Sequence, residues 1–354
     1  MDQSRIAQLN KSPAHSGSSI LYVMSRDQRV SDNHALLAAQ AVALEHKLPL
    51  VVLFNFYAQS GVRSREHYAF MLAGLAEVED RLASLSIHFI VRTGDAVDSI
   101  TELIAEIDPS AIYFDFSPLS GPRRIARTIA ANANHPVFVV DTHNIIPVWI
   151  ASDKQEFAAH TMRHKVTRHL AQHLVAPAEV VKHTYALTRL PASTSLDTIT
   201  TELLPSVTSS GITVDATPGE SAARAHLANF IDHQLDGYAL ARNDMAHDQQ
   251  SGLSPYLHFG HISSLRVALD VMSQTPADPL LLSQPLMAHA GEEPSREDGM
   301  NALFEEMVVR KELADNFCFY APSYTDFAGA NSWAVKTLDD HRADPREFTY
   351  SREQ

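Results

Sequence analysis

PLVVLFNF, at residues 49–56, is a run of aliphatic and aromatic side chains with the length of a buried strand. Similar runs lie at 20–24 (ILYVM), 87–91 (IHFIV), 111–116 (AIYFDF) and 136–141 (PVFVVD). Helical patterns separate them, at residues 33–48, 64–85, 96–107 and 123–131. Strands that are apolar along their whole length and alternate with helices predict a parallel sheet covered on both faces. The fold class predicted for this part is a doubly wound, Rossmann-like α/β domain.

Beyond Trp149 the strand-like runs give way to helical patterns. Residues 154–174 have a helical pattern, and residues 176–219 are rich in Ser, Thr and Pro. Further helical patterns follow at 220–235, 261–273, 301–320 and 330–340. The sequence therefore predicts an α/β plus all-α protein in four parts: a disordered polar tail (1–19), an α/β domain (20–150), a helix and linker (151–219) and a helical domain (220–354).

Charge and cysteine content exclude several classes of protein. The net charge is −14, and residues 176–354 carry −13 of it, whereas nucleic-acid binders usually present a basic surface. The one cysteine, Cys318, excludes a disulfide scaffold and Cys-rich metal sites, and it fits a reducing compartment. The chain has no apolar run long enough to span a membrane and no apolar segment of a secretory signal near its start. We expect a cytoplasmic protein.

Two common nucleotide motifs are missing. The first predicted strand is followed by SRDQR at 25–29 rather than by the glycine-rich turn of a dinucleotide-binding site, and no phosphate-binding P-loop occurs. This disfavours a dehydrogenase. His160, His164, His169 and His173 include two i, i+4 pairs, but no nearby carboxylate or cysteine completes a metal site. A solvated helix face is the favoured interpretation, and no metal site is predicted.

Three short stretches hold candidate site residues. In QSGLSPYLHFG (250–260), Ser254 and Pro255 form a helix-start signature, which indicates either a phosphate-binding turn or an ordinary capped helix. Glu306 and Arg310 stand i, i+4 apart, the spacing of a surface salt bridge or of two groups facing one pocket. In the stretch GYALARND, Tyr238, Arg242 and Asn243 are candidates for a pocket, and a core tyrosine with a surface arginine is the alternative.

Taken together and in order, six blocks of the sequence resemble class II cyclobutane-pyrimidine-dimer DNA photolyases, which belong to the photolyase/cryptochrome family. The blocks run from near residue 20 almost to the end of the chain: YVMSRDQRVSDNHALL (22–37), VDTHNIIPVWIASDKQEFAAHTMRHK (140–165), YALARND (238–244), QSGLSPYLHFGHIS (250–263), EEMVVRKELADNFCFY (305–320) and SWAVKTLDDHRADPRE (332–347).

The resemblance implies an α/β antenna domain, a linker and an all-α domain that holds FAD. It implies a carbon–carbon lyase that repairs pyrimidine dimers in DNA by light-driven electron transfer from reduced FAD. It also implies a further antenna chromophore, a deazaflavin or folate. Damaged DNA is the expected partner of a monomeric protein, associated with the nucleoid if the source is bacterial.

The resemblance also assigns roles to single residues. Glu306 matches the carboxylate that faces the dimer, and Arg242 is similar to a contact to the DNA backbone. The implied flavin contacts are Tyr238, Gln250, Ser251, Gly252, Leu253, Ser254, Arg310 and Asn316, with residues 250–254 forming the phosphate cradle.

Family members continue past the position matching Gln354 with further helices of the flavin domain, so the resemblance implies a helical domain that is incomplete at its C-terminus. The family's tryptophan relay cannot be drawn, because Trp149 and Trp333 are the only tryptophans. Two alternatives remain open: a photolyase-like blue-light flavoprotein without repair activity, and an inactive fragment that keeps only the α/β domain.

Overall fold

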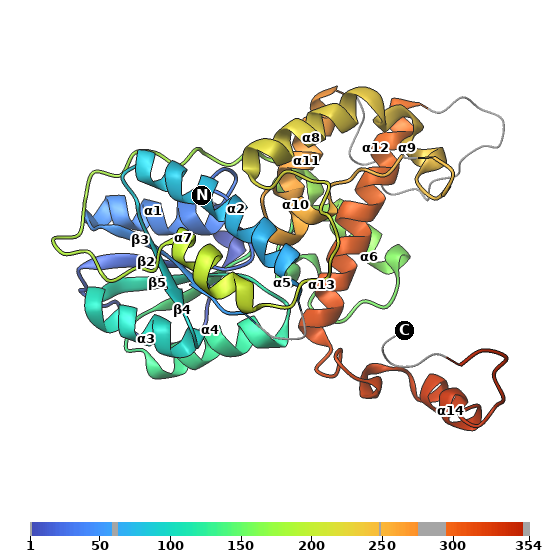
Figure 1. Ribbon diagram of the computed structural model, residues 1–354, viewed down its shortest axis with the longest axis horizontal. Helices are drawn as coiled ribbons and strands as arrows, with labels where there is room; N and C mark the ends of the chain where they lie inside the picture. Colours follow the sequence, from blue (N-terminus) through green and yellow to red (C-terminus); the bar gives the residue numbers. More distant parts are fainter. Residues whose placement is uncertain (1, 59–62, 248, 275–294, 350–354) are drawn as a thin grey trace.

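The computed structural model describes residues 2–58, 63–247, 249–274 and 295–349. A six-stranded sheet in the order β1-β6-β5-β2-β3-β4 forms one part of the molecule, and helices form the other (Figure 1). The five strands from β2 to β6 run parallel to their neighbours, as predicted, and β1 runs antiparallel to β6. Their bounds are β1 (Ile6–Gln8), β2 (Ser19–Met24), β3 (Leu50–Phe56), β4 (His88–Thr93), β5 (Pro109–Asp115) and β6 (Val137–Val140).

Helices cover both faces of the sheet. Alternate side chains of a strand point to opposite faces. Ile20 and Tyr22 of β2 therefore join one core with α1 (His34–His46) and α2 (Arg65–Ser84). Leu21 lies on the other face with α3 (Ala96–Ile107) and α4 (Ser120–Asn132). This two-sided burial explains why the strands are apolar throughout rather than alternating.

The N-terminal segment corrects one prediction. Residues 3–8, expected as part of a loose tail, form a short 3-10 turn and strand β1, with Ile6 opposite Val140. The buried Arg5 guanidinium donates to the carbonyl oxygens of Asn144 and Ile145 at 2.9 and 2.6 Å. A three-residue strand that includes a glutamine has no apolar pattern of its own, so only its long-range pairing defines it.

The segment after β6 is helical in the described residues. It contains α5 (Val148–Ala151), α6 (Ala159–His173), α7 (Leu196–Thr198), α8 (Glu220–His233), α9 (Leu235–Ala241), α10 (Ser254–Phe259), α11 (Ser264–Gln274), α12 (Arg296–Phe304), α13 (Lys311–Tyr320) and α14 (Ser332–Asp340). Between α6 and α7 the chain follows the sheet edge, where Thr194 donates its backbone N–H to Val91 O at 2.8 Å. Helix α14 buries no side chain and stands apart from the rest in Figure 1. Among the described helices, none is long and apolar enough to cross a bilayer.

The helix predicted at 301–320 is interrupted by a π-helical turn at Glu305–Arg310, between α12 and α13. The hydrogen bonds of a π turn join residues five apart, so a side chain on the far side of the turn is rotated relative to its place in a regular α-helix. The pattern EEMVVR is compatible with either geometry, which is why the sequence predicted a continuous helix.

Gly260 marks the closest approach of the helical segment to the sheet. It ends α10 with a φ of +71°, and a Cβ at this position would collide with the carbonyl oxygen of Arg26 in the loop after β2. The C-terminal end of α10 therefore packs on that loop by direct backbone contact.

We predict that Gly260→Ala destabilises the protein by several kcal/mol more than Gly211→Ala. Both glycines have a φ near +70°, so each alanine costs roughly 1–2 kcal/mol in backbone strain. Gly211 has no atom within 4 Å of an added Cβ, so only Gly260→Ala adds a clash. Urea unfolding of the two variants measures the difference, and equal losses would contradict close packing at Gly260.

Candidate functional site

The loop after β2 is held by a carboxylate from the neighbouring strand. Asp115, the last residue of β5, accepts the backbone N–H groups of Ser25, Arg26 and Asp27 at 2.8, 3.0 and 3.1 Å. Its other oxygen accepts the Tyr22 hydroxyl at 2.6 Å. Burial, together with the nearby Asp27, raises the pKa of Asp115 to about 7. The stretch SRDQR is thus folded back over the carboxyl end of the sheet and faces the helical segment, where Arg26 pairs with Asp315 at 3.0 Å.

A cavity of about 500 Å³ lies where this edge of the sheet meets the helices. Carboxyl ends of parallel strands are where open α/β sheets usually bind ligands. The lining comes from the end of α9, the segment before α10, α10 itself, α12 with the π turn, α13, and the loop after β6. The lining residues are His143, Tyr238, Arg242, Asn243, Gln250, Ser251, Ser254, Leu257, His258, Leu303, Glu306, Met307 and Lys311.

Seven of the candidate residues from the sequence meet in this cavity: Tyr238, Arg242, Asn243, Gln250, Ser251, Ser254 and Glu306. Arg242 Nη1 donates to Glu306 Oε1 at 2.6 Å, and the guanidinium lies 5.9 Å from the centre of the Tyr238 ring. The Gln250 side-chain amide donates to the Arg242 carbonyl oxygen. Burial raises the pKa of Tyr238, so its hydroxyl stays protonated at neutral pH.

Arg310 does not pair with Glu306, which corrects the salt bridge expected from their i, i+4 spacing. Because the π turn lies between them, Arg310 Nε instead donates to Glu305 Oε1 at 3.1 Å. Glu305 is buried and also accepts Arg163 at 2.8 Å. Arg310 is outside the lining of the cavity.

Gly252, Leu253 and Asn316 also lie outside the cavity lining. Gly252 has a φ of +62° and leaves no room for a Cβ beside the His226 imidazole, so it shapes the turn between Ser251 and Ser254. Leu253 is a core residue with 1% exposure. Asn316 is fully buried, where it accepts the backbone N–H of Glu156 at 2.7 Å and donates to Lys154 O at 3.0 Å.

The helix start at Ser254 differs by one residue from the predicted one. Leu253 is the N-cap of α10, and no side chain caps the helix. Ser254 is instead the first helical residue, and it lines the cavity. Since α10 has only six residues, its dipole is small, and an anion here would be bound mainly by side-chain donors.

Comparisons with known proteins agree with this architecture. The model of the DNA photolyase family matches residues 20–183. A deoxyribodipyrimidine photo-lyase of Oryza sativa subsp. japonica is 34% identical, over 99% of this chain and 68% of its own length. One from Methanothermobacter thermautotrophicus is 31% identical, over 98% of this chain and 72% of its own length. This chain belongs to the DNA photolyase family.

Solved structures show the same fold. A class III photolyase from Agrobacterium tumefaciens superposes with a TM-score of 0.65, at 19% identity, over 97% of this chain and 65% of that one. A Synechocystis cryptochrome gives a TM-score of 0.63, at 14% identity, over 87% of this chain and 62% of that one. By sequence alone, the deoxyribodipyrimidine photo-lyase of Potorous tridactylus is 36% identical over 94% of this chain, and the match covers 60% of that protein's length.

In this photolyase-family chain the cavity owes its positive charge to Arg242 and Lys311. Lys311 Nζ donates to Asn144 Oδ1 at 2.7 Å and to His143 O at 3.1 Å, and burial lowers its pKa. Burial and the neighbouring Lys311 lower the pKa of His143 to about 4, and burial also lowers that of His258. Both imidazoles are therefore neutral at neutral pH. Sequence patterns did not single out Lys311 or His143, although the position of His143 just after a strand end is a usual one for ligand contacts.

Glu312, next to Lys311, connects α13 to the loop after β6. Its Oε1 accepts the backbone N–H groups of Ile145 and Ile146 at 2.7 and 3.1 Å, and burial raises its pKa to about 8. Between its ordinary pKa and this value the folded state keeps a proton that the unfolded state has released. The contribution of Glu312 to the free energy of unfolding therefore falls as the pH rises from 5 to 8.

We predict that Glu312→Gln removes this pH dependence, since glutamine does not titrate. The variant should gain stability relative to the unmodified chain as the pH rises from 5 to 8, at up to about 1.4 kcal/mol per pH unit. Urea unfolding at several pH values measures this, with the exposed Glu297→Gln as control. A difference that does not change with pH would show that Glu312 is ionised in the fold.

Proposed function

We propose that this chain is a class II photolyase that repairs cyclobutane pyrimidine dimers in DNA by light-driven electron transfer from reduced FAD. The observation that carries the proposal is the cavity at the carboxyl edge of the sheet, because residues chosen from three separate family-like blocks line it together. These are Tyr238 and Arg242, then Gln250, Ser251 and Ser254, and finally Glu306.

The residues that line the cavity suit an anionic ligand with an aromatic ring system. Gln250, Ser251 and Ser254 supply amide and hydroxyl donors on one side, and Lys311 supplies a cation. Leu257, Leu303 and Met307 supply apolar surface for a ring. The Gly252 turn, in which no Cβ fits, is the kind of backbone that lets main-chain N–H groups approach a phosphate.

FAD, when bound, supplies light absorption and a donatable electron, and the protein supplies binding and orientation. We assign Gln250, Ser251 and Ser254 to the FAD phosphates and Tyr238 to the flavin. Gly252 and Leu253 shape the turn that carries these donors. Arg310 and Asn316 act at one remove, since Arg310 holds Glu305 on the π turn and Asn316 fixes the backbone near Glu156.

Glu306 and Arg242 form the part of the cavity that we assign to DNA. Their side chains are 45% and 19% exposed, and an ion pair this open to water contributes about 1 kcal/mol or less. Arg242 can therefore move from Glu306 to a DNA phosphate at little cost. The exchange would leave the Glu306 carboxyl group free to hydrogen-bond with a pyrimidine dimer, whose weakened stacking favours extrusion into a pocket.

The proposal also includes an antenna chromophore, a location and an oligomeric state. A deazaflavin or folate in the α/β part would act as antenna, and the protein would work as a cytoplasmic monomer. Retention of FAD without repair would instead indicate a blue-light flavoprotein, and failure to retain FAD would indicate a chain in which only the α/β part is functional.

We predict that Ser254→Glu weakens FAD retention at least about tenfold, because a carboxylate at this position repels the phosphates. The measurement is the ratio of flavin to protein absorbance after incubation with FAD and desalting. Ser332→Glu, the same change at the first residue of the exposed helix α14, is the matched control and should keep the flavin of the unmodified chain. Equal retention in the two variants would remove Ser254 from the cofactor site.

Glu306→Gln should lower the yield of light-driven dimer repair about tenfold while leaving FAD content unchanged. The amide keeps the shape of the side chain but loses a charge-assisted hydrogen bond worth about 1.5–3 kcal/mol. Repair is followed by the recovery of pyrimidine absorbance in ultraviolet-irradiated oligothymidylate, with the exposed Glu297→Gln as control. Loss of flavin from Glu306→Gln would mean that Glu306 supports the cofactor rather than the lesion.

A further inference from the structure

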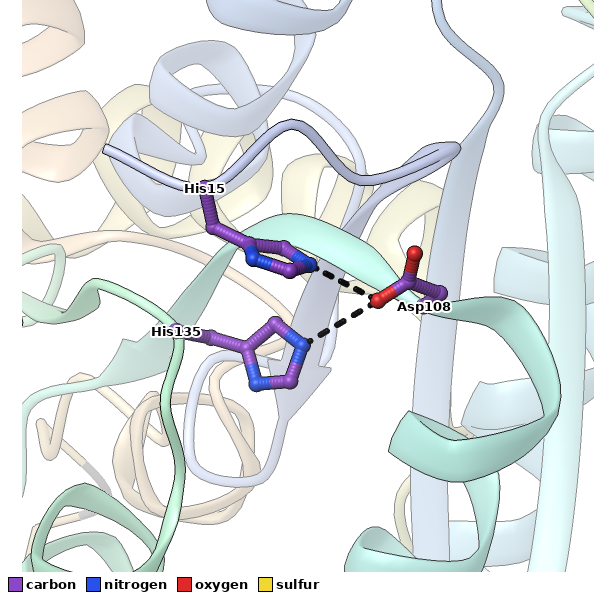
Figure 2. Close-up of side chains that lie close together, drawn as sticks. All are labelled: His15, Asp108 and His135. Carbon is purple, nitrogen blue, oxygen red and sulfur yellow. Dashed lines mark hydrogen bonds and ion pairs between the residues drawn. The ribbon is translucent and has the colours of Figure 1, made fainter. Parts of the chain in front are cut away.

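A second cluster of chemically active side chains lies at the opposite edge of the sheet. Asp108 directly precedes β5, His135 lies just before β6, and His15 lies in the segment leading to β2. Because parallel strands all begin at one edge, the three residues gather at the amino edge of the sheet, and the cavity with Glu306 is at the carboxyl edge. Figure 2 shows both imidazoles pointing at one carboxylate oxygen.

The ligand atoms of the three residues lie close together. His15 Nε2 lies 2.8 Å from Asp108 Oδ1, and His135 Nε2 lies 3.4 Å from the same atom. The ligand atoms of the three residues all lie within 4.8 Å of one another. Bonds of about 2.0–2.1 Å to a tetrahedral metal ion place ligand atoms about 3.3 Å apart, so rearrangement of these three side chains alone could bring their ligand atoms to an ion.

The backbone around Asp108 is held in place without any ion. Asp108 has a φ of +41°, an uncommon conformation for a residue other than glycine. Its carbonyl oxygen accepts the backbone N–H of Ser18 at 2.7 Å, and Gly17 packs so closely on it that no Cβ would fit. Asp108 is the C-cap of α3, where the left-handed conformation is common, and its backbone N–H donates to Ile104 O.

The backbone at His135 is also held in place by hydrogen bonds. The Asn10 side chain donates to His135 O at 2.9 Å and accepts the backbone N–H of Val137 at 3.1 Å. The second ring nitrogen of His135, Nδ1, is buried and has no hydrogen-bond partner in the described part of the chain. A metal ion bound at Nε2 would require the ring proton to lie on this Nδ1.

Charge and exposure favour a cation with access to water. Asp108 supplies a carboxylate oxygen, Oδ1, that faces both imidazoles. The side chains of His15 and His135 are 33% and 13% exposed, and that of Asp108 is 57% exposed. Two imidazoles and one carboxylate with an open side match a zinc centre with three protein ligands and one water.

We propose that His15, Asp108 and His135 bind a divalent transition-metal ion, with zinc as the ion the ligand set suits, and that this ion fastens the N-terminal segment to the amino edge of the sheet. Magnesium and calcium fit poorly, because both prefer ligand sets made entirely of oxygen. This site is independent of the proposed repair function.

The test is titration of the full chain, stripped with EDTA and then dialysed, with ZnCl₂ in the presence of excess MgCl₂. Isothermal calorimetry should show one zinc ion per chain at this site, with affinity at least tenfold weaker in His135→Ala and in Asp108→Asn. Asparagine tolerates positive φ, so Asp108→Asn preserves the backbone. His341→Ala, which breaks another His–Asp pair of 2.7 Å on the surface, is the matched control and should bind like the unmodified chain.

Thermal unfolding gives a second readout. Zinc at a hundredfold excess over its dissociation constant should raise the melting temperature of the unmodified chain by a few degrees, and should not do so in His135→Ala or Asp108→Asn. Absence of saturable zinc binding would overturn the proposal. So would equal affinity in all variants, which would place the zinc on other histidines and leave the cluster as a hydrogen-bonded clamp.

Discussion

One buried guanidinium, that of Arg29, joins the three segments on which the rest of the molecule depends. It is 1% exposed and donates to Asp27 Oδ1 at 2.8 Å. It also donates to carbonyl oxygens of Gly260 on the helical side and Thr142 after β6, at 3.1 and 3.2 Å. Burial alone would lower the pKa of Arg29, but the adjacent Asp27 more than compensates. Removing one member of such a buried pair typically costs about 3–5 kcal/mol, because the other charge is left unpaired.

The network that begins at Arg29 also sets the geometry of the cavity. Asp27 accepts Arg29 and lies 3.2 Å from His143 Nδ1, so the loop that carries His143 and supports Lys311 is held against the loop after β2. On the other side, Asp32 pairs with Arg266 of α11 at 2.7 Å and with Arg224 of α8 at 3.2 Å. Helices α8 and α11 are thus held at the sheet edge by this carboxylate. Neither contributes a residue to the lining of the cavity, so the residues facing a ligand need not themselves hold the two parts together.

Much of the α/β part could be predicted from the sequence, because its strands are apolar on both faces and its helices are long. The run at 49–56 and the helix at 96–107 agree with the structure to within a residue. Strand β1 could not be predicted in this way, since three residues carry no period and depend on pairing with β6. Other features that depend on tertiary contacts could not be predicted from the sequence for the same reason.

The candidate site likewise has residues that could be predicted from the sequence and residues that could not. Tyr238, Arg242 and Glu306 could be identified because the blocks that contain them are distinctive, and the cavity brings them together. Lys311 lies in such a block but was not singled out, because its importance comes from the carbonyl of His143, far away in sequence. The partner of Arg310 was mispredicted because a π turn cannot be distinguished from an α-helix by apolar spacing alone.

Strand β1 also connects the two edges of the sheet that carry chemistry. It runs antiparallel to β6, so Arg5 lies at the carboxyl edge and the chain then passes Asn10 toward His15 at the amino edge. Arg5 holds the carbonyls of Asn144 and Ile145, in the same loop that receives Lys311 and Glu312. Fastening His15 to Asp108 would therefore restrain one end of a segment whose other end supports the loop beneath the cavity. A stretch that looks like a polar tail in the sequence therefore runs, in the fold, from the loop beneath the cavity to the proposed metal site.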